Sequence, residues 1–315
     1  PNDPIHGNSG PIYVKRKHLF DVEMVEQEQA LLETLAKLGM PRFLDQNIAN
    51  PYGVAPVARN SKEGKRQSAT VMYLDPARRR SNLTIIDEAP ATSLLMNGKR
   101  VTGVRYRRDG QELNATADKV VLSAGVYHSP QIMMLSGIGP SAQLKQHGIP
   151  VVHDMAGIGE NYQDHPMLTM TFKSNPENRK PLMRGRSTVK LYFKTDPARE
   201  YLNFHIIPRE AINLSGIGDM LGFSCNLLEQ TNRGRLTLQS ADPNDLPNID
   251  PQVLEHPKDI AAMLAAMKFV QRLTSTEPLS EFFGELFSPT PGQDWEKFAR
   301  SSYTSYYHGV GTCKM

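Results

Sequence analysis

The sequence is poor in cysteine and contains no long apolar run, and each shortage excludes a class of protein. Two cysteines among 315 residues cannot form a disulfide scaffold. Neither C-x-x-C nor H-E-x-x-H occurs, so we expect no metal site. No stretch approaches the roughly 18 apolar residues of a membrane-spanning helix, so we expect no membrane span.

An excess of charge of one sign is also missing. The chain has 36 Lys and Arg against 33 Asp and Glu, a formal net charge of +3, which attracts phosphate weakly and argues against nucleic-acid binding. A charged fraction of 22% and a hydrophobic fraction of 39% fit a globular protein rather than a disordered one. The length suits one large or two modest domains. We expect a soluble protein, cytoplasmic or peripheral to a membrane, with its compartment left open.

Two long helices are predicted from apolar residues at helical spacing. The first follows an N-cap at Asp21 and ends before Gly39 and Pro41. The second covers residues 260–273, whose apolar side chains share one face and are expected in the core.

Between these helices, the spacing of the apolar residues changes from the helical repeat to the patterns typical of strands. Asn97-Gly98 and Asp109-Gly110 are typical of type I′ hairpin turns, because these residues accept positive φ angles. In the first half of the chain, the predicted strands are residues 83–86, 93–96, 101–106, 112–117, 120–122 and 151–153. Those of a second sheet are residues 169–172, 190–193, 201–207 and 222–228, followed by a strand at 236–238. Residues 120–122 are apolar throughout, as in a strand buried on both faces.

One helix start and one glycine-rich turn are predicted near the middle of the chain. Ser129 as N-cap and Pro130 in the first turn predict a helix over residues 131–135. The G-I-G-P-S-A run at residues 137–142 has the letters of a dinucleotide-binding fingerprint, but it follows a helix and precedes a proline, so we interpret it as a helix-ending turn. No G-x-S-x-G occurs, so Ser136 is a poor candidate for a nucleophile.

Two polar positions are candidates for function. His308 lies between aromatic residues and a Gly-x-Gly-Thr turn, and its imidazole, with an ordinary pKa of about 6.5, suits proton transfer at neutral pH. A polar group follows a glycine loop and either binds a cofactor or ties the loop: Asn161, Gln163, Asp164 and His165. The residues by themselves favour a structural histidine at 308 over a catalytic one.

Five motifs, in order, resemble those of the glucose–methanol–choline (GMC) oxidoreductases, flavoenzymes that oxidise alcohols. Three of them are S-A-G-V-Y-H-S-P-Q at residues 123–131, G-I-G-E-N-Y-Q-D-H-P at 157–166 and H-G-V-G-T-C-K-M at 308–315. The other two cover residues 64–85 and 232–251, so the resemblance spans nearly the whole chain. Val126 and Tyr162 depart mildly from the family's usual residues.

The resemblance implies an α/β fold (α+β mixed). It combines part of an FAD-binding Rossmann-like domain, carrying a β-meander, with a substrate domain built on an antiparallel sheet with flanking helices. Three segments are implied: residues 1–165, of which about 81–165 bind FAD; residues 166–230, the substrate-domain sheet; and residues 231–315, a C-terminal-type segment.

The resemblance also implies a reaction, the FAD-dependent oxidation of an alcohol to an aldehyde or ketone. A hydride passes to the flavin while His308 accepts the hydroxyl proton. The cofactor-binding residues carried over from the family are Ala91, Ser123, Ala124, Gly125, Asn161, Gln163, Asp164 and His165. Residues 123–125 would meet the adenosine part, and residues 161–165 the flavin side.

Other activities on the same fold stay open. An alcohol oxidase that uses oxygen is one, and a non-catalytic flavoprotein homologue or a lyase is another. The electron acceptor (a quinone, a dye-like carrier or oxygen) and the alcohol are not indicated by the sequence. No carboxylate with an aromatic cage, as a choline site favours, is recognised.

The resemblance also bears on the two ends of the chain. In the family, the strand–glycine loop–helix that binds the FAD pyrophosphate would precede Pro1, and a second active-site His or Asn would follow Met315. We therefore expect this chain to be the middle part of a longer enzyme, and to bind FAD weakly or not at all by itself.

Overall fold

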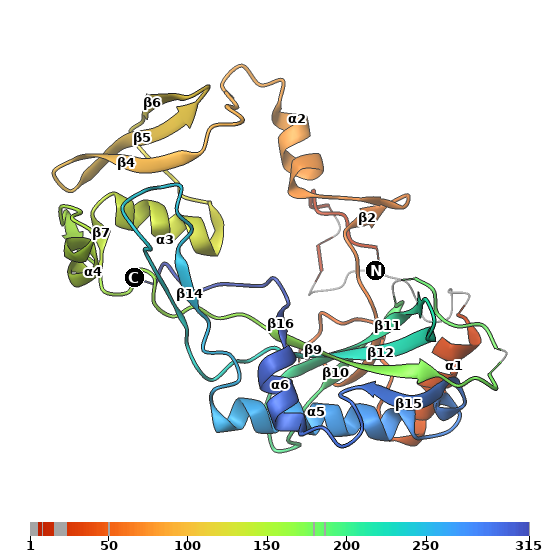
Figure 1. Ribbon diagram of the computed structural model, residues 1–315. Helices are drawn as coiled ribbons and strands as arrows, with labels where there is room; N and C mark the ends of the chain where they lie inside the picture. Colours follow the sequence, from red (N-terminus) through yellow and green to blue (C-terminus); the bar gives the residue numbers. More distant parts are fainter. Residues whose placement is uncertain are drawn as a thin grey trace. The chain divides into compact units, whose positions relative to one another are not determined.

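The computed structural model describes residues 6–7, 9–15, 24–49, 51–178, 180–185 and 187–314, and the chain divides into two compact units (Figure 1). Unit 1 comprises residues 1–83, 166–229 and 257–304; unit 2 comprises residues 84–165, 230–256 and 305–315. Each unit is assembled from separate stretches of chain, so the packing of each depends on contacts between residues far apart in the sequence.

Unit 1 is built on an antiparallel sheet, which confirms the second sheet predicted from the sequence. Its strands pair in the order β1, β10, β11, β12, β9 and β15, with β16 also beside β9. They are β1 (Gly53–Pro56), β9 (Pro166–Ser174), β10 (Val189–Phe193), β11 (Phe204–Leu214), β12 (Gly218–Leu227), β15 (Phe283–Ser288) and β16 (Thr304–Ser305).

The two faces of this sheet differ in polarity, because successive residues of a strand point to opposite sides. One row across five strands is fully buried, each side chain 0% exposed: Val54, Leu191, Ile206, Cys225 and Leu168. The neighbouring row, on the other side, consists of Gly53, Tyr192, His205, Asn226 and Met167. We call these two sides the apolar face and the polar face.

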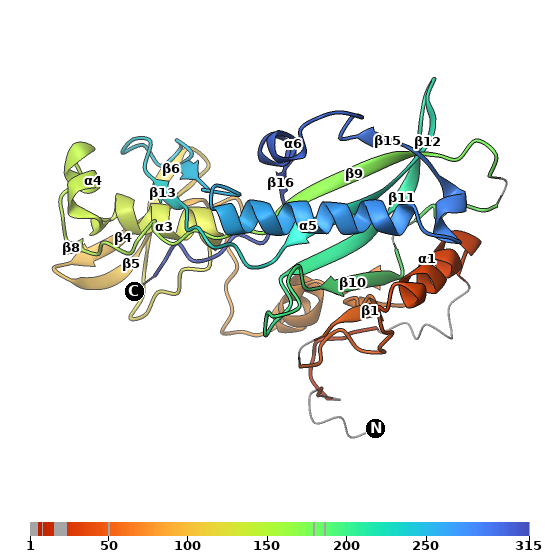
Figure 2. The ribbon, with the colours of Figure 1, turned by 90° about the horizontal axis from the view of Figure 1, so that it is seen from below.

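Helix α5 (Pro257–Thr274) covers the apolar face, as Figures 1 and 2 show. Its Phe269 ring stacks on Phe193 of β10 with the ring centroids 4.5 Å apart, and Met263 and Met267 are 0% exposed. Burial of one large apolar side chain stabilises a fold by about 1.5–3 kcal/mol. The helix predicted over residues 260–273 is confirmed, and its apolar stripe forms core.

Helix α1 (Glu26–Lys37) confirms the other long helix, while Asp21 lies outside the described residues. Gly39 follows its end with φ +78°, a backbone conformation in which a side chain would be strained. The remaining elements of unit 1 are β2 (Ser61–Lys62), β3 (Lys65–Arg66), the π-helix η1 (Thr70–Leu74), α2 (Asp75–Ala77), the 3₁₀ turn η2 (Leu279–Phe282) and α6 (Trp295–Ser302).

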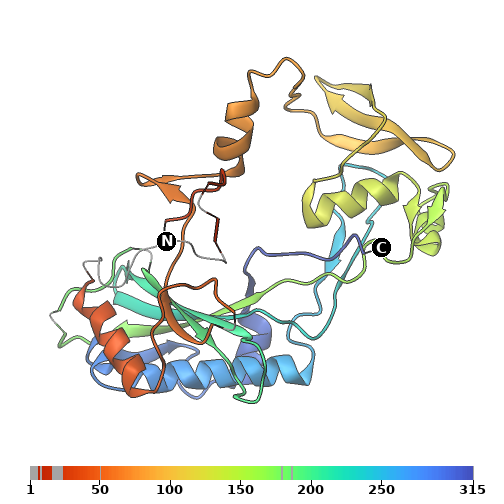
Figure 3. The ribbon, with the colours of Figure 1, turned by 180° about the vertical axis from the view of Figure 1, so that it is seen from behind.

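Unit 2 contains a three-stranded antiparallel meander with helix α3 beside it (Figure 3). The backbone N–H of Leu94 donates to Ser136 Oγ at 2.7 Å, and Leu94 packs with Ile132 and Ile138. Ser136 thus has a structural role. The elements of unit 2 are β4 (Ala91–Asn97), β5 (Arg100–Arg108), β6 (Gln111–Thr116), α3 (Gly125–Leu135), β7 (Ile138–Gly139), α4 (Ser141–Gln146), β8 (His153–Asp154), β13 (Arg235–Thr237) and β14 (Asn248–Asp250).

The two turns of the meander differ in type. Asp109 (φ 52°) and Gly110 (φ 75°) both have positive φ, so the type I′ turn predicted there is confirmed. The type I′ prediction for the first turn is wrong. Asn97 still belongs to β4, so the turn residues are Gly98 and Lys99, and of these only Gly98 has positive φ (56°), as in a type II′ turn.

Residues 83–86 and 120–122 do not form the predicted strands. Val121 is 85% exposed, and no described segment pairs with either stretch. Apolar composition favours burial, but a strand exists only where a neighbour takes its backbone hydrogen bonds. Of the strand predicted at 151–153, only His153 belongs to β8, which pairs in parallel with β7.

Helix α3 begins earlier than predicted. It begins at Gly125 rather than at residue 131, and Pro130 lies in its interior. Ser129 is not its N-cap, since Ser129 Oγ accepts a hydrogen bond from the Ala124 N–H at 3.0 Å from inside the helix. After the helix, Gly137 adopts φ +83°, which confirms the interpretation of this glycine as a helix-ending turn.

Candidate active site

The loop of residues 157–165 in unit 2 runs beside residues 310–313, and hydrogen bonds join the two segments. Gln163 and Val310 exchange two backbone hydrogen bonds of 3.0 and 2.9 Å. The Gly159 N–H donates to the Thr312 carbonyl at 2.8 Å. This pairing brings the polar loop next to the segment that carries His308.

Glycine is required at one point in each of these two segments, because the backbone of another stretch of chain nearly touches it there. A Cβ atom on Gly311 would lie 2.1 Å from the Asn161 carbonyl oxygen, and one on Gly159 would lie 2.3 Å from the Leu236 carbonyl oxygen. Both glycines also have positive φ. They therefore permit close packing between two protein segments.

Asp164 lies at the centre of the cluster and is 5% exposed. Its Oδ1 accepts hydrogen bonds from the backbone N–H groups of His165 (2.7 Å) and His308 (3.0 Å). Its Oδ2 accepts from the hydroxyls of Ser305 and Tyr162, the latter at 3.3 Å. Four donors offset the cost of burying a carboxylate. Asp164 thus fixes the His308 segment against the polar loop.

The imidazole of His308 is held in one tautomer. Its Nδ1 lies 2.5 Å from the Tyr306 carbonyl oxygen, and a carbonyl oxygen only accepts, so Nδ1 carries the proton. In the neutral ring, Nε2 is then free to accept a proton. The ring stacks on that of Tyr306, with centroids 4.5 Å apart and planes inclined by 14°, and the residue is exposed.

His165 lies beside this pair, its ring centroid 5.5 Å from that of His308 and 6.5 Å from that of Tyr306. Burial lowers the pKa of His165, and the nearby His308 lowers it further, while Asp164 acts in the opposite direction. A neutral His165 does not repel a proton that arrives on its neighbour.

Helix α3 contacts the cluster at two points. The hydroxyls of Tyr127 and Tyr162 are 3.2 Å apart, and burial raises the pKa of Tyr162, which keeps its hydroxyl protonated. The Thr312 hydroxyl donates to the Val126 carbonyl at 2.5 Å. In a helix that carbonyl accepts from the residue four positions on, which here is Pro130 and has no N–H. Thr312 supplies the missing donor.

The predicted site residues occupy three places in unit 2. One cluster contains Asn161, Gln163, Asp164, His165 and His308. The exposed start of α3 contains Ser123, Ala124 and Gly125, one residue before the carbonyl that Thr312 contacts. Ala91 lies in the meander instead, as the exposed first residue of β4, where it pairs with Tyr106.

Ser305, Tyr306 and Thr312 complete the cluster, and they were not predicted from the sequence. Each acts through a hydrogen bond or a ring contact that only the folded chain creates. One signal was present: Pro130 in a helix leaves a carbonyl without a donor, which then has to come from a side chain elsewhere.

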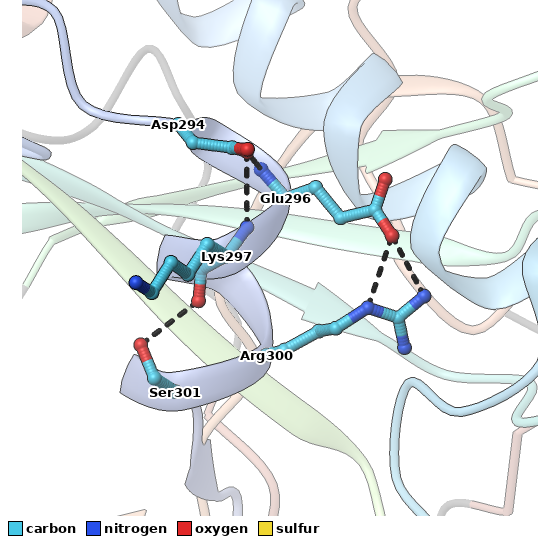
Figure 4. A pocket seen from close by; sticks show the side chains of 5 residues that line it. All are labelled: Asp294, Glu296, Lys297, Arg300 and Ser301. Atoms are coloured by element: carbon cyan, nitrogen blue, oxygen red, sulfur yellow. Dashed lines mark hydrogen bonds and ion pairs between the residues drawn. The ribbon is translucent and has the colours of Figure 1, made fainter.

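A groove of about 390 Å³ lies on unit 1 at α6, and none of the predicted site residues lines it (Figure 4). Its lining residues are Asp294, Glu296, Lys297, Arg300 and Ser301. Asp294 caps the helix by accepting from the N–H groups of Glu296 and Lys297, and Arg300 pairs with Glu296 at 2.9 Å. These contacts are those of an ordinary capped helix.

Metal ligands and membrane spans were searched in the described part of the chain. No group of three or more His, Cys, Asp or Glu residues there is placed to hold a metal ion. No helix there has the length and apolar content to cross a membrane.

The two cysteines have different surroundings and form no disulfide. Cys225 is 0% exposed on the apolar face, where burial raises its pKa to about 12. Cys313 is exposed, at the edge of the cluster. Only Cys225 is therefore part of the buried core.

Comparison with known proteins identifies the family to which this fold belongs. The family model described as GMC oxidoreductase matches the chain over residues 10–167 and 230–315. An alcohol dehydrogenase (acceptor) of Pseudomonas putida is 33% identical, over 86% of this chain and 55% of its own. An oxygen-dependent choline dehydrogenase 1 of Chromohalobacter salexigens is 30% identical, over 100% of this chain and 61% of its own. The crystal structure of pyridoxine 4-oxidase from Mesorbium loti has a TM-score of 0.88 and 25% identity, covering 99% of this chain and 63% of that one.

Fold and matches together define the class, a mixed α/β fold with antiparallel sheets. The chain belongs to the GMC oxidoreductase family. This confirms the resemblance drawn from the motifs and the fold class that it implied. The chain spans 55% and 61% of the length of the two curated relatives described above.

Proposed function

We propose that the chain takes part in the FAD-dependent oxidation of an alcohol, with His308 as the proton acceptor. One observation carries the proposal: the Tyr306 carbonyl holds the His308 Nδ1–H, which leaves Nε2 free on an exposed ring. An alcohol hydroxyl can meet such a nitrogen directly, as general base catalysis requires. The relatives named as alcohol and choline dehydrogenases support the alcohol as the substrate class.

The residues at the start of α3 fit the cofactor. Gly125 has φ +80°, and no atom outside its own stretch of chain lies within 4 Å of the position that its Cβ would take, so a ligand can approach the backbone there. Ser123 and Ala124 are exposed beside it. The residues that would hold FAD are Ala91, Ser123, Ala124, Gly125, Asn161 and Gln163, with Asp164 and His165 supporting them by fixing the loop on the flavin side.

When bound, FAD supplies the hydride acceptor for the alcohol carbon. The protein's own part is proton transfer and positioning. His308 Nε2 accepts the hydroxyl proton, and the Tyr306 carbonyl stabilises the resulting imidazolium through Nδ1–H. Asp164 keeps the His308 backbone in place through its N–H.

We assign a separate role to each of the three segments of the chain. Residues 81–165 and 231–315 hold the cofactor and the catalytic histidine, and residues 166–230 form the sheet of the substrate domain. Oxygen and a quinone, supplied in turn as electron acceptors, would separate an oxidase from a dehydrogenase.

The test of the proposed function is the substitution His308→Ala, measured in the full-length protein loaded with FAD. Loss of a general base slows flavin reduction by the alcohol by about 10²- to 10⁴-fold. Stopped-flow absorbance of the flavin measures this rate. The control is His153→Ala, which removes an exposed histidine in β8. A His308→Ala variant that reduces its flavin at the wild-type rate would contradict the assignment.

A further inference from the structure

Thr312 joins three segments of unit 2 through two of its atoms. Its carbonyl oxygen accepts a hydrogen bond from the Gly159 N–H at 2.8 Å, and its hydroxyl donates to the Val126 carbonyl at 2.5 Å. The residue is 2% exposed, so bulk water does not compete for either bond. The polar loop, the segment that carries His308 and the first turn of α3 therefore meet at one buried residue.

The hydroxyl bond exists because α3 contains Pro130. In a regular helix the Val126 carbonyl accepts from the N–H four positions on, and Pro130 has no N–H. Any other residue at this position would satisfy the carbonyl within the helix, and α3 would then need no donor from outside. The proline therefore ties the first turn of α3 to the segment that carries His308.

Packing joins the same two segments beside this bond. A Cβ atom on Gly309 would lie 3.0 Å from Val126 Cγ1 and 3.2 Å from Tyr162 Cε2, so the residue after His308 lies directly against α3 and the polar loop. The Tyr127 hydroxyl, in the same turn of α3, lies 3.2 Å from that of Tyr162. A second residue of the His308 segment therefore contacts the first turn of α3.

We propose that Thr312 is a positioning residue, which fixes His308 relative to the start of α3 by donating to the Val126 carbonyl. The inference rests on the proposed function, in which α3 begins with cofactor-binding residues and His308 accepts the proton. Thr312 acts through the intervening backbone, which the Gln163–Val310 hydrogen bonds hold in place. Proton transfer depends on such placement, because a misplacement of about 1 Å can slow a reaction about a hundredfold.

The first test compares Thr312→Val with Thr312→Ser in the full-length protein loaded with FAD. Valine keeps the size of the side chain without the donor, whereas serine keeps the donor. With benzyl alcohol, choline or ethanol, whichever reduces the wild-type flavin fastest, we expect valine to lower the limiting rate of flavin reduction by about tenfold and serine by less than about threefold. The half-saturating alcohol concentration should change by less than about twofold, since Thr312 is buried and does not meet the alcohol.

A loss of stability alone would give a different result. A destabilised variant that is still folded keeps the limiting rate of the wild type, whereas a displaced His308 lowers that rate. An unchanged limiting rate in Thr312→Val, or an equal loss in the valine and serine variants, would contradict the proposal.

The second test is hydrogen exchange in the same proteins without alcohol, followed by mass spectrometry. The N–H groups of His308 and Val310 are hydrogen-bonded in the structure. We expect them to exchange about fivefold faster in Thr312→Val than in the wild type, and within about twofold of the wild type in Thr312→Ser. Equal exchange at His308 in Thr312→Val and the wild type would overturn the proposal.

Pro130→Ala separates positioning from stability in the same measurement. It should slow exchange in α3 and speed exchange at His308, because the Val126 carbonyl gains a donor within the helix and its bond to Thr312 weakens. Slower exchange at both places would overturn the proposal. Exchange needs no reaction, so it decides the role of Thr312 even where the His308→Ala test refutes the proposed function.

Discussion

One buried polar side chain in each unit, Asp164 in unit 2 and Asn226 in unit 1, differs from the other in how completely it is hydrogen-bonded. In unit 2, the buried Asp164 has four donors, and even the carbonyl that Pro130 leaves without an N–H receives the Thr312 hydroxyl. In unit 1, the polar face leaves the Lys190 ammonium and Asn226 Oδ1 without partners in the described structure. Completed hydrogen bonding positions a segment, whereas a buried group without a partner costs free energy.

We expect the largest change in the free energy of unfolding from Asp164→Asn, in the fully hydrogen-bonded cluster of unit 2. The amide nitrogen that replaces Oδ2 is a donor and opposes the hydroxyls of Ser305 and Tyr162. We expect the free energy of unfolding to fall by about 1–3 kcal/mol. Urea unfolding, followed by circular dichroism, measures it.

The second prediction concerns unit 1, where Lys190→Met removes the half-buried ammonium that has no partner in the described structure. Because no bond is lost and a desolvated ammonium is removed, the free energy of unfolding should stay equal or rise. A destabilisation as large as that of Asp164→Asn would break the distinction between the two units.

A smaller effect is expected at Thr312. Thr312→Val removes the donor to the Val126 carbonyl and should cost about 1 kcal/mol in unfolding free energy. In a Pro130→Ala background the helix regains its own N–H, so the same change should cost less. The double-mutant cycle measures this coupling. Additive effects of the two changes would show that the hydroxyl does not replace the proline's missing donor.

The smallest effect concerns pH and His165. Its pKa is lowered from 6.5 in the folded chain, mainly by burial. Above pH 6.5 neither state holds the proton and the stability is complete; as pH falls below that value, the unfolded chain takes up a proton that the folded one refuses, so stability falls. Urea midpoints at pH 7.5 and 5.5 should differ less in His165→Asn than in the wild type. An equal pH dependence in both proteins would contradict the shift.

The sequence was most informative where a periodic pattern decided the structure. Strands β9 to β12 of unit 1 and the helix of residues 260–273 were predictable, because alternating or helical spacing of apolar residues specifies both an element and its buried face. The shorter strands of unit 1, such as β1 and β15, were not predicted. The strands at 83–86 and 120–122 were predicted wrongly, since a strand also depends on a partner that local sequence does not reveal. The start of α3 was missed because Gly125 resembles a turn residue rather than a helix residue.

The candidate site was predictable only in part, for a related reason. His308 and the residues of the polar loop stood out through the family motifs. Which of them bind and which only support was not determined, because that depends on hydrogen bonds between segments far apart in the sequence, such as Asp164 to Ser305. Lys190 and Asn226 gave no signal, since being unpaired is a property of the folded sheet.

The different surroundings of the two cysteines give the protein a built-in labelling position. Cys225 is sealed in the apolar face, whereas Cys313 is exposed five positions after His308. A maleimide dye should therefore attach at Cys313 under native conditions and at both thiols only after unfolding. A single fluorophore would then report on the environment of the cluster without any engineered cysteine.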